Sequence, residues 1–381
     1  MNVARSTRKL KHALLDVLPA ISPAWGRVLL SKPRTLEVLK PFEVYSSAPP
    51  SVFLPNIDSM AGTPFFSAED KSEKGATIRF GPDSVWSLRA GEQVGDLRIL
   101  STGNVVLDGK FHLDLDFTPA KGLLLPHKVL WSEDALIACW PHGWGTYYDF
   151  VMFVMTKLLR IEHALGPTVW QMARLAYPRR HARYERDFLQ ALGVDEGRVI
   201  DTQSFRGAVG AAQIVVANNH TRLFPSPDDV LRLRDRFAPP RPGKASRRLY
   251  ISRAGTRRVV NESELRPIMD RFGIEFVEDA PRTLQEQIEL FRAASLVVGP
   301  HGAAFTNITW MPPGATLLEL FNRAYFPPHF YYLARVLGHD YACWIEPGPA
   351  AQTDASRHDD LHVDPNGFSR LVEAAVNGAG R

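Results

Sequence analysis

The stretch SLVVGPHGAAFTNITWMPPGATLLEL, residues 295–320, decides the fold that we expect for this chain. An apolar run ends at Gly299, and the small residues that follow His301 open a new segment. This pattern predicts a buried strand, a tight turn, a helix and then a second strand in ATLLEL, residues 315–320. Strands that alternate with helices in this way are typical of α/β proteins with a mostly parallel sheet.

The same alternation continues upstream of this stretch. In the second half, strands are predicted in RLYISR (248–253) and IEFVED (274–279), and helices in NESELRPIMDRFG (261–273) and TLQEQIELFRAA (283–294). The first half gives a similar series: a strand in ALIACW (135–140), a long helix over 145–166, a strand in PTVWQMARLAY (167–177), a helix in PRRHARYERDFLQALG (178–193) and strands in GRVID (197–201) and AAQIVVAN (211–218). Residues 41–130 are rich in Pro, Gly and short alternating runs, which predict short strands and hairpins.

The charge balance does not favour a nucleic-acid partner. The chain has 381 residues, 45 of them Lys or Arg and 41 Asp or Glu, which gives a formal net charge of +4. Residues 232–258 hold ten basic residues and a single acid, Asp235, but they lack the interleaved aromatic residues of RNA-binding segments. We therefore expect no nucleic-acid binding.

The cysteines and the apolar segments indicate in which cellular compartment the protein is expected. Cys139 and Cys343 are the only cysteines and form no CxxC pair, which excludes a disulfide scaffold and favours a reducing compartment. No signal peptide or run of 18 apolar residues is evident, so a cytoplasmic protein is expected. Two interpretations of the basic start stay open: a peripheral contact with an anionic membrane, or a solvated terminus. Its basic residues are Arg5, Arg8, Lys9 and Lys11.

The turn at 299–304 is a candidate phosphate site. Unpaired N–H groups and a partial positive charge at a helix start suit a phosphate, and Gly302 with Ala303 lets a ligand approach the backbone. The spacing is not the dinucleotide GxGxxG pattern, which argues against NAD. The alternative is a tight turn whose glycines serve geometry only. His301 is likewise either a hydrogen-bond donor to the ligand or a helix cap.

Arginines and a lone carboxylate are expected at the same sheet edge. Arg253 follows a predicted strand directly, and Arg257 and Arg258 come in the next loop. Guanidinium groups match diphosphate oxygens and keep their charge, although a solvated basic loop is the competing interpretation. Glu319 in an apolar strand is costly to bury without a partner. It is expected to accept hydrogen bonds from ribose hydroxyls or to pair with an arginine.

A further polar cluster occurs where the long helix of the first half begins. His142, Tyr147, Tyr148 and Asp149 lie within CWPHGWGTYYDFVMF, residues 139–153. Asp149 beside an apolar helix is a candidate general base with a raised pKa. The alternative is an acid that serves only the start of the helix.

No metal site is expected. Asp114 and Asp116 have the spacing of a metal-binding carboxylate pair, but the segment around them resembles a hairpin. The segment RHDDLHVD, residues 357–364, reads as a polar loop that leads into a helix start.

At these motifs the sequence resembles glycosyltransferase family 61. The resemblance is strongest over 246–346 and is carried by YISR, by Arg258 to Glu262, by TLQEQIELF, VVGPHGAAFTN, MPPGATLLEL and the aromatic stretch YFPPHFYYLA. A weaker likeness is seen in WGTYYDFVMFVMTKLLRIE, residues 144–162.

The resemblance implies an α/β fold of the GT-B type, with two Rossmann-like domains facing a cleft and a β-rich N-terminal extension. The implied segments are an extension with short strands over 1–130, an acceptor domain over 131–237, a linker over 238–248, a nucleotide-sugar-binding domain over 249–346, and a tail over 347–381 that packs back on the N-terminal domain.

The resemblance also implies the roles of individual residues. The donor would be bound by Arg253, Arg258, Asn261, Glu262, Thr283, Glu286, Gln287, Gly299, His301, Gly302, Ala303, Ala304, Asn307 and Glu319. Apart from the resemblance, Asn261 at the start of the next predicted helix is expected to cap it. The acceptor would be bound by Trp144, Tyr147 and Tyr148. Asp149 or His142 would be the catalytic base.

The sequence departs from the family at one point. The family usually has Asn-aromatic-aromatic-His at this helix start, where this chain has Thr146, Tyr147, Tyr148 and Asp149. If the family histidine is the base, Asp149 replaces it chemically, because both groups accept a proton. If that histidine positions the acceptor, Asp149 marks a different acceptor or a lost activity.

The implied function is an inverting transfer from a nucleotide-sugar donor to a glycan or lipid-linked glycan acceptor, with no cofactor and no essential metal. Bacterial members of the family are linked to capsule, exopolysaccharide or lipopolysaccharide synthesis, and the expected location is the cytoplasm or the inner face of the cell membrane. Two alternatives stay open: a nucleotide-sugar epimerase of the GT-B type, and a non-catalytic protein that binds nucleotide sugars or glycans.

Overall fold

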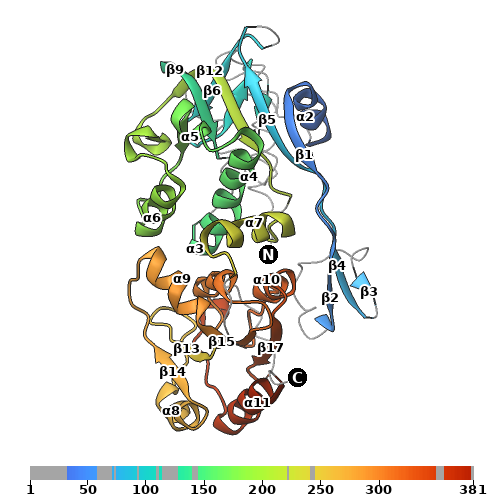
Figure 1. The fold of residues 1–381 in the computed structure, drawn as a ribbon, viewed down its shortest axis with the longest axis vertical. Helices are drawn as coiled ribbons and strands as arrows, with labels where there is room; N and C mark the ends of the chain where they lie inside the picture. The colour runs from blue at the N-terminus through green and yellow to red at the C-terminus, as the bar shows by residue number, and fades with distance from the viewer. Residues whose placement is uncertain are drawn as a thin grey trace, which may run out of the picture. The chain divides into compact units, whose positions relative to one another are not determined.

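The computed structural model describes residues 32–57, 71–72, 74–91, 94–108, 111–113, 128–139, 145–220, 223–240, 245–348 and 356–378. These residues cluster into two compact units (Figure 1). The first unit is made of the described residues that lie within Met1–Ala48, Gly81–Gly145 and Phe153–Pro225. The second is made of the described residues that lie within Pro49–Phe80, Thr146–Met152 and Ser226–Arg381.

The first unit is built on a nine-stranded mixed sheet. Four strands in the order β11-β10-β9-β12 are parallel, and β12 continues into antiparallel pairs with β5 and β6. The strands are β1 (Glu43–Ser47), β5 (Asp83–Arg89), β6 (Leu97–Leu100), β7 (Val105–Leu107), β8 (Phe111–Leu113), β9 (Val129–Ala138), β10 (Arg174–Tyr177), β11 (Val199–Asp201) and β12 (Ala208–Ala217). The helices are α2 (Lys32–Leu39), α4 (Thr156–Leu165), α5 (Val169–Met172) and α6 (Arg183–Leu192), with short 3-10 turns η2 (Lys40–Phe42), η7 (Glu196–Arg198) and η8 (Thr202–Ser204).

The long helix predicted over 145–166 is present in three parts. It begins as α3 (Tyr147–Asp149), continues as the π-helical η6 (Phe150–Met155) and ends in α4, whose C-terminal cap is Gly166. The strand predicted over 167–177 is shorter than expected, because its first half forms the helix α5. The alternating apolar residues of 167–177 fit both conformations, so periodicity alone does not separate them.

The second unit contains a five-stranded parallel sheet in the order β14-β13-β15-β16-β17. Its strands are β13 (Arg247–Ile251), β14 (Ile274–Val277), β15 (Ala294–Pro300), β16 (Thr316–Phe321) and β17 (Asp340–Ile345), and a small separate sheet is formed by β2 (Val52–Pro55), β3 (Lys71–Ser72) and β4 (Gly75–Ile78). The helices are α7 (Pro227–Phe237), α8 (Glu262–Arg271), α9 (Leu284–Arg292), η9 (Ala303–Trp310, a 3-10 helix), α10 (His329–Leu337), η10 (Ser356–His358) and α11 (Pro365–Gly378).

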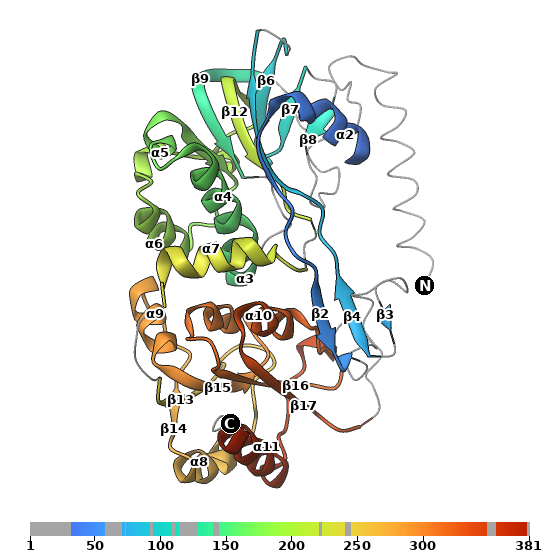
Figure 2. The ribbon, with the colours of Figure 1, turned by 45° about the vertical axis from the view of Figure 1, so that its right-hand side comes forward.

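The core of the second unit explains why these strands form. β15 and β16 are buried along almost their whole length, as expected for strands covered on both faces. The C-terminal tail belongs to this core: Phe368 and Val372 pack in one apolar cluster with Tyr250 and Leu265. Figure 2 shows α11 beside α8. The sequence analysis expected the tail to pack on the N-terminal domain; here Phe368 and Val372 of the tail lie in the core of the second unit.

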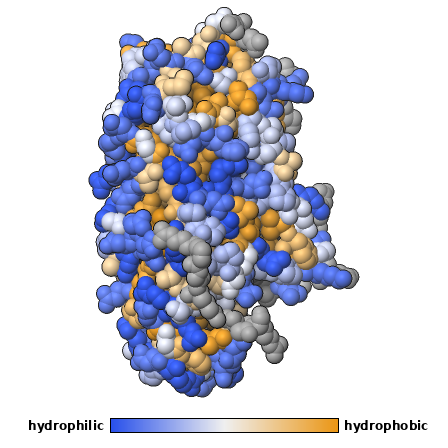
Figure 3. Space-filling view, viewed as in Figure 1, coloured by the Kyte–Doolittle hydropathy of each residue, from blue (hydrophilic) through white to orange (hydrophobic). Residues whose placement is uncertain are grey.

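These observations confirm the α/β class, while the GT-B arrangement of two domains stays a prediction. Both cysteines are free, and Cys139 is buried. Within the described ranges no helix is long and apolar enough to cross a membrane. Figure 3 shows hydrophilic residues over much of the viewed face, with apolar patches between them.

Candidate functional site

The carboxyl ends of β13, β15 and β16 bring three loops to one edge of the parallel sheet in the second unit. The loops carry residues 252–261, 301–302 and 322–328. Ligands of open α/β sheets bind at this edge. It is therefore the place where the predicted donor residues can act together.

Arg253 and the turn after β15 are in direct contact. Nη1 of Arg253 donates a hydrogen bond of 3.1 Å to the main-chain oxygen of His301, and its Nε donates to the main-chain oxygen of Thr256. A Cβ atom at Gly302 would collide with Nη1 of Arg253. A larger residue at position 302 would therefore displace the side chain of Arg253. Burial and the neighbouring Arg257 lower the pKa of Arg253 from its ordinary value.

Arg257 is a second cation at this edge, for which the sequence left open a diphosphate contact or a solvated basic loop. Its backbone is in the left-handed region, with φ of 60°, which is uncommon for a residue with a long side chain. Its guanidinium carbon lies 5.2 Å from the ring centre of Tyr325. Its buried Nε has no hydrogen-bond partner among the residues that the structure describes. A buried cationic donor of this kind is suited to an incoming anion.

His301 is buried and held by aromatic rings and by one carboxyl group. Its ring stacks on Phe321 at 5.2 Å between centroids and meets Tyr325 edge-on at 5.4 Å. Its Nδ1 lies 2.5 Å from Oε1 of Glu319. Oε2 of Glu319 in turn accepts a hydrogen bond of 2.8 Å from the hydroxyl of Tyr341. The side chain of Glu319 has no exposed surface, so its first role here is to hold His301.

Burial favours the neutral form of both members of this pair. It raises the pKa of Glu319 well above its ordinary value and, together with Arg257, His329 and Arg253, lowers the pKa of His301 well below its own. Both groups are neutral when the carboxyl group of Glu319 donates to Nδ1 of His301. The hydrogen of the imidazole then resides on Nε2, which becomes a donor for a ligand.

The helix start that carries Asp149 belongs to the second unit. Thr146 caps α3, and Oδ2 of Asp149 accepts hydrogen bonds from the main-chain nitrogen and the hydroxyl of Thr146, at 3.0 and 2.9 Å. This capping box is the structural role that the sequence left open. Asp149 also faces the site, because its charge acts on the hydroxyl groups of Tyr148 and Tyr325 and helps to raise the pKa of each.

Tyr147 and Tyr148 link this helix start to the donor loops. The hydroxyl of Tyr147 donates a hydrogen bond of 2.8 Å to Oδ1 of Asn307, whose Nδ2 donates to Oε1 of Gln287 at 2.9 Å. The ring of Tyr148 lies against that of His329, with 5.5 Å between centroids. Asn307, predicted to bind the donor, is thus hydrogen-bonded both to Tyr147, predicted to bind the acceptor, and to Gln287, a second predicted donor residue.

Several residues predicted to bind the donor make structural contacts, and their role in donor binding stays a prediction. Thr283 and Glu286 form the capping box of α9. Gly299 is required because a Cβ atom there would lie 2.5 Å from the main-chain oxygen of Ile251 on the neighbouring strand. Glu262 accepts hydrogen bonds of 2.9 and 3.0 Å from the hydroxyl of Ser252.

Two further predicted donor residues contact the C-terminal tail. Asn261 stands at the N-cap position of α8, but its side chain makes no capping bond, which corrects the expected cap. It exchanges hydrogen bonds with the main chain of Val363 instead, at 2.9 and 3.0 Å. Arg258 pairs with Asp360 at 2.7 Å. His142 and Trp144 lie outside the described residues.

The sequence analysis missed Tyr325, His329 and Tyr341, and it left the role of Arg257 open. Tyr325 and His329 lie in YFPPHFYYLA, the aromatic stretch that follows β16. Tyr341 lies on β17, where parallel pairing brings Cys343 opposite Glu319. The position of Arg257 depends on a left-handed backbone, for which an arginine gives no signal in the sequence.

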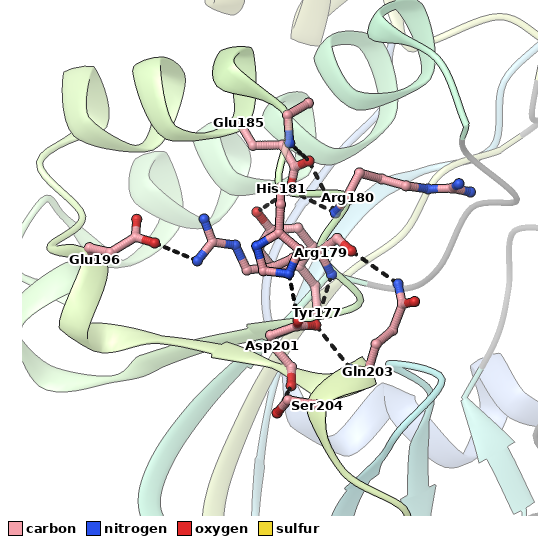
Figure 4. A network of polar contacts seen from close by, with 10 residues as sticks. Tyr177, Arg179, Arg180, His181, Glu185, Glu196, Asp201, Gln203 and Ser204 are labelled. Atoms are coloured by element: carbon pink, nitrogen blue, oxygen red, sulfur yellow. Dashed lines mark hydrogen bonds and ion pairs between the residues drawn. The ribbon is translucent and has the colours of Figure 1, made fainter.

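In the first unit, a second polar network fixes the loop after β10 (Figure 4). Oδ1 of Asp201 accepts hydrogen bonds from the main-chain nitrogen of Arg179 at 3.2 Å and from that of Gln203 at 3.0 Å, and Oδ2 lies 2.9 Å from Nε2 of His181. Glu185 accepts from the hydroxyl of Tyr177 at 3.0 Å. The network joins this loop to β11 and α6, and the sequence analysis predicted no role for it.

The sequence of the chain is similar to those of known glycosyltransferases. The model of the family described as Glycosyltransferase 61 matches residues 10–318. The chain is 27% identical over 184 residues to "Xylan glycosyltransferase MUCI21" of Arabidopsis thaliana, which covers 46% of this chain and 36% of that protein. It is 28% identical over 158 residues to "EGF domain-specific O-linked N-acetylglucosamine transferase" of Drosophila melanogaster, covering 38% of this chain and 30% of that protein. The chain thus spans about a third of the length of each of these relatives.

Proposed function

The chain belongs to the glycosyltransferase 61 family, and from this premise we propose that it is a glycosyltransferase that moves a sugar from a nucleotide-sugar donor to a hydroxyl group of a glycan. The observation that carries the proposal is the pair of guanidinium groups at the carboxyl edge of the second sheet. Arg253 and Arg257 converge on the turn at His301 and repel each other. A diphosphate between them would offset this repulsion.

The proposed donor site uses four groups. Arg253 and Arg257 bind the diphosphate oxygens, and the first N–H groups of η9 at Ala303 and Ala304 point to the same region. Nε2 of His301 donates to a phosphate oxygen or to a sugar hydroxyl. Glu319 fixes the orientation of that imidazole and does not touch the ligand itself. A ligand bound here would thus meet a preformed set of donors, which need not reorganise during the reaction.

In the proposed reaction the acceptor hydroxyl attacks the anomeric carbon from the face opposite the diphosphate. A new C–O bond forms as the bond from the sugar to the diphosphate breaks, and the electron pair leaves with the diphosphate. The proton of the hydroxyl passes to the carboxylate of Asp149 or to His142. Negative charge grows on the leaving diphosphate, where Arg253 and Arg257 stabilise the transition state more than the ground state. The configuration at the anomeric carbon is inverted.

We further propose that this transfer needs no metal, because the two arginines supply positive charge where a bound cation would otherwise act. The GT-B arrangement, a glycan or lipid-linked acceptor, a role in capsule, exopolysaccharide or lipopolysaccharide synthesis, a cytoplasmic location and a membrane contact through the basic N-terminus belong to the same proposal. These parts of the proposal are supported by the sequence analysis alone. The relatives named above act, by their names, on xylan and on EGF domains.

A panel of nucleotide sugars tests the proposal. Release of nucleoside diphosphate is measured for each donor, with and without a mixture of glycan acceptors and in the presence of EDTA. We expect release from one class of donor, stimulated by an acceptor and indifferent to EDTA, and Arg253→Ala should lose most of kcat/KM. Near-normal activity of Arg253→Ala would remove the diphosphate role. Binding without turnover would identify a non-catalytic binding protein, and an isomerised donor sugar without acceptor would identify an epimerase.

A further inference from the structure

The segment Ser356–Val363 lies beyond the range that matches the family model, yet it is fastened to the loop after β13. The main-chain nitrogen of Leu361 donates to the oxygen of Arg258 at 3.0 Å, and that of Val260 donates to the oxygen of Leu361 at 3.0 Å. Asp360 accepts from both the main-chain nitrogen and Nε of Arg258, at 3.1 and 2.7 Å. This loop is the one that carries Arg253 and Arg257.

The same segment is also fastened to the loop after β16. Nδ2 of Asn322 donates a hydrogen bond of 2.8 Å to the main-chain oxygen of Asp359. Oδ1 of Asn322 accepts from the main-chain nitrogen atoms of Ala324 and Tyr325, at 3.0 and 2.9 Å. Asn322 is buried, while Asp359 is exposed, so the hydrogen bond between them is partly buried. The segment therefore ties together two of the three loops of the candidate site.

The segment brings a third arginine to the site. The guanidinium carbon of Arg357 lies 5.9 Å from the ring centre of Tyr325, and that of Arg257 lies 5.2 Å from the same centre. Tyr325 also meets the ring of His301 edge-on. A single aromatic ring thus contacts both cations and the histidine of the proposed diphosphate site.

The charges that act on Tyr325 are of both signs. The positive charges of Arg257 and Arg357 act on its hydroxyl group more strongly than the negative charge of Asp149 does. The two guanidinium groups around this ring suit an anionic ligand beside it.

We propose that Arg357 is a donor-binding residue that contacts the diphosphate of the nucleotide sugar beside Arg257, and that Asp360 is the residue that positions it and the loop after β13. This inference rests on the proposed function. It extends the donor site to a part of the chain that the family match does not cover.

The test is a calorimetric titration of the full-length chain with UDP, GDP, dTDP and ADP in EDTA. The variants are Arg357→Ala, Arg357→Lys and the matched control Arg370→Ala, which removes an exposed arginine from the same tail. We expect Arg357→Ala to raise the Kd of the bound nucleoside diphosphate about tenfold, as the loss of one charge-assisted hydrogen bond would. Arg357→Lys should recover part of the loss, and Arg370→Ala should bind as the wild type does.

Asp360 is tested by rescue. Asp360→Ala should raise the Kd about threefold, in the range of a surface ion pair, and Asp360→Glu should restore it, because Glu keeps the carboxylate. Ser369→Ala is the control for stability, since Ser369 accepts a hydrogen bond from Arg271 elsewhere on the tail. If Asp360→Ala and Ser369→Ala lose similar amounts of Tm and show similar increases in Kd, the weaker binding reflects lost stability alone. That result would overturn the positioning role of Asp360.

The outcomes separate the inference from the proposed function. If the wild type binds one of the four nucleoside diphosphates and Arg357→Ala binds it equally well, the inference is overturned and the proposed function stands. If the wild type binds none of them, both are overturned. If Arg357→Ala loses Tm, the Kd of Arg357→Lys is compared with that of the wild type, because lysine keeps the charge and loses only the planar fork. A higher Kd for Arg357→Lys would support the inference, and an equal Kd would overturn it.

Discussion

The guanidinium group of Arg253 donates a hydrogen bond of 3.1 Å to the main-chain oxygen of His301, which joins the loop after β13 to the turn after β15. Gly302 makes this contact possible, because any Cβ atom at that position would collide with Nη1 of Arg253. The backbone of Gly302 is extended, with φ of −176°, which any residue adopts. Gly302 is therefore needed because Arg253 approaches it closely. Its backbone conformation does not require a glycine.

Gly302→Ala should consequently impair donor use while leaving the fold intact. The added methyl group displaces the flexible end of Arg253 from the turn, and we expect kcat/KM to fall roughly tenfold or more with little change in Tm. Gly299→Ala is the matched control, because its Cβ atom would meet the main chain of Ile251, which cannot move aside. That variant should lose stability. Unchanged kcat/KM in Gly302→Ala would show that Arg253 has no part in donor binding.

Asp149→Asn separates the two roles of Asp149. Asparagine keeps an oxygen that can accept the hydrogen bonds of Thr146, so Tm should stay close to that of the wild type. It cannot take up a proton at neutral pH, so kcat should fall by about two to four orders of magnitude. The measurement is a steady-state assay beside a thermal melt. A normal kcat would leave Asp149 with the helix cap alone and direct attention to His142.

Glu319→Gln and Glu319→Ala test how His301 is held. The amide of glutamine can donate to Nδ1 of His301 and still accept from Tyr341, so the imidazole keeps its hydrogen on Nε2. We expect donor affinity near that of the wild type for Glu319→Gln. Glu319→Ala leaves His301 buried without this partner and should cost about 1–3 kcal/mol of stability as well as donor affinity. An equal loss of donor affinity in both variants would place the imidazole hydrogen of His301 on Nδ1 instead.

His339 makes stability depend on pH. Its ring is buried, and Nε2 donates a hydrogen bond of 3.0 Å to the main-chain oxygen of Ile308. Burial lowers the pKa of His339 to about 4, below the ordinary value near 6.5. The folded state therefore binds this proton less tightly than the unfolded state does. The contribution to stability is full above pH 6.5 and is lost as the pH falls toward 4, with about 2 kcal/mol gone at pH 5.

Urea unfolding at pH 7 and pH 5 measures this contribution. His339→Gln keeps a side-chain donor for Ile308 but does not titrate, so it should lose less stability than the wild type between the two pH values. His358→Gln, at an exposed position, should behave as the wild type does. An unchanged pH dependence in His339→Gln would contradict this role of His339.

Local signals in the sequence predict the edge of the second sheet well. Apolar runs bounded by Gly299 and by PPG (312–314) mark β15 and β16, and the rule that parallel strands end at one edge brings Arg253 to the turn at His301. The pairing of His301 with Glu319 depends on the register of two strands, which apolar runs do not specify. The docking of the tail on Arg258 and Asn261 joins residues 102 positions apart and has no local signature. The π-helical part of the long helix is likewise invisible to a period of 3.6 residues.

The most direct test of the central claim is the phosphorus NMR spectrum of a nucleoside diphosphate in EDTA, recorded with the wild type and with Arg257→Ala. If Arg253 and Arg257 bind the donor diphosphate without a metal, both phosphorus signals should shift on adding the wild type, and the shift should be largely lost with Arg257→Ala. Phosphorus signals that stay unchanged with the wild type, or that shift equally with both proteins, would contradict a diphosphate site at these two arginines.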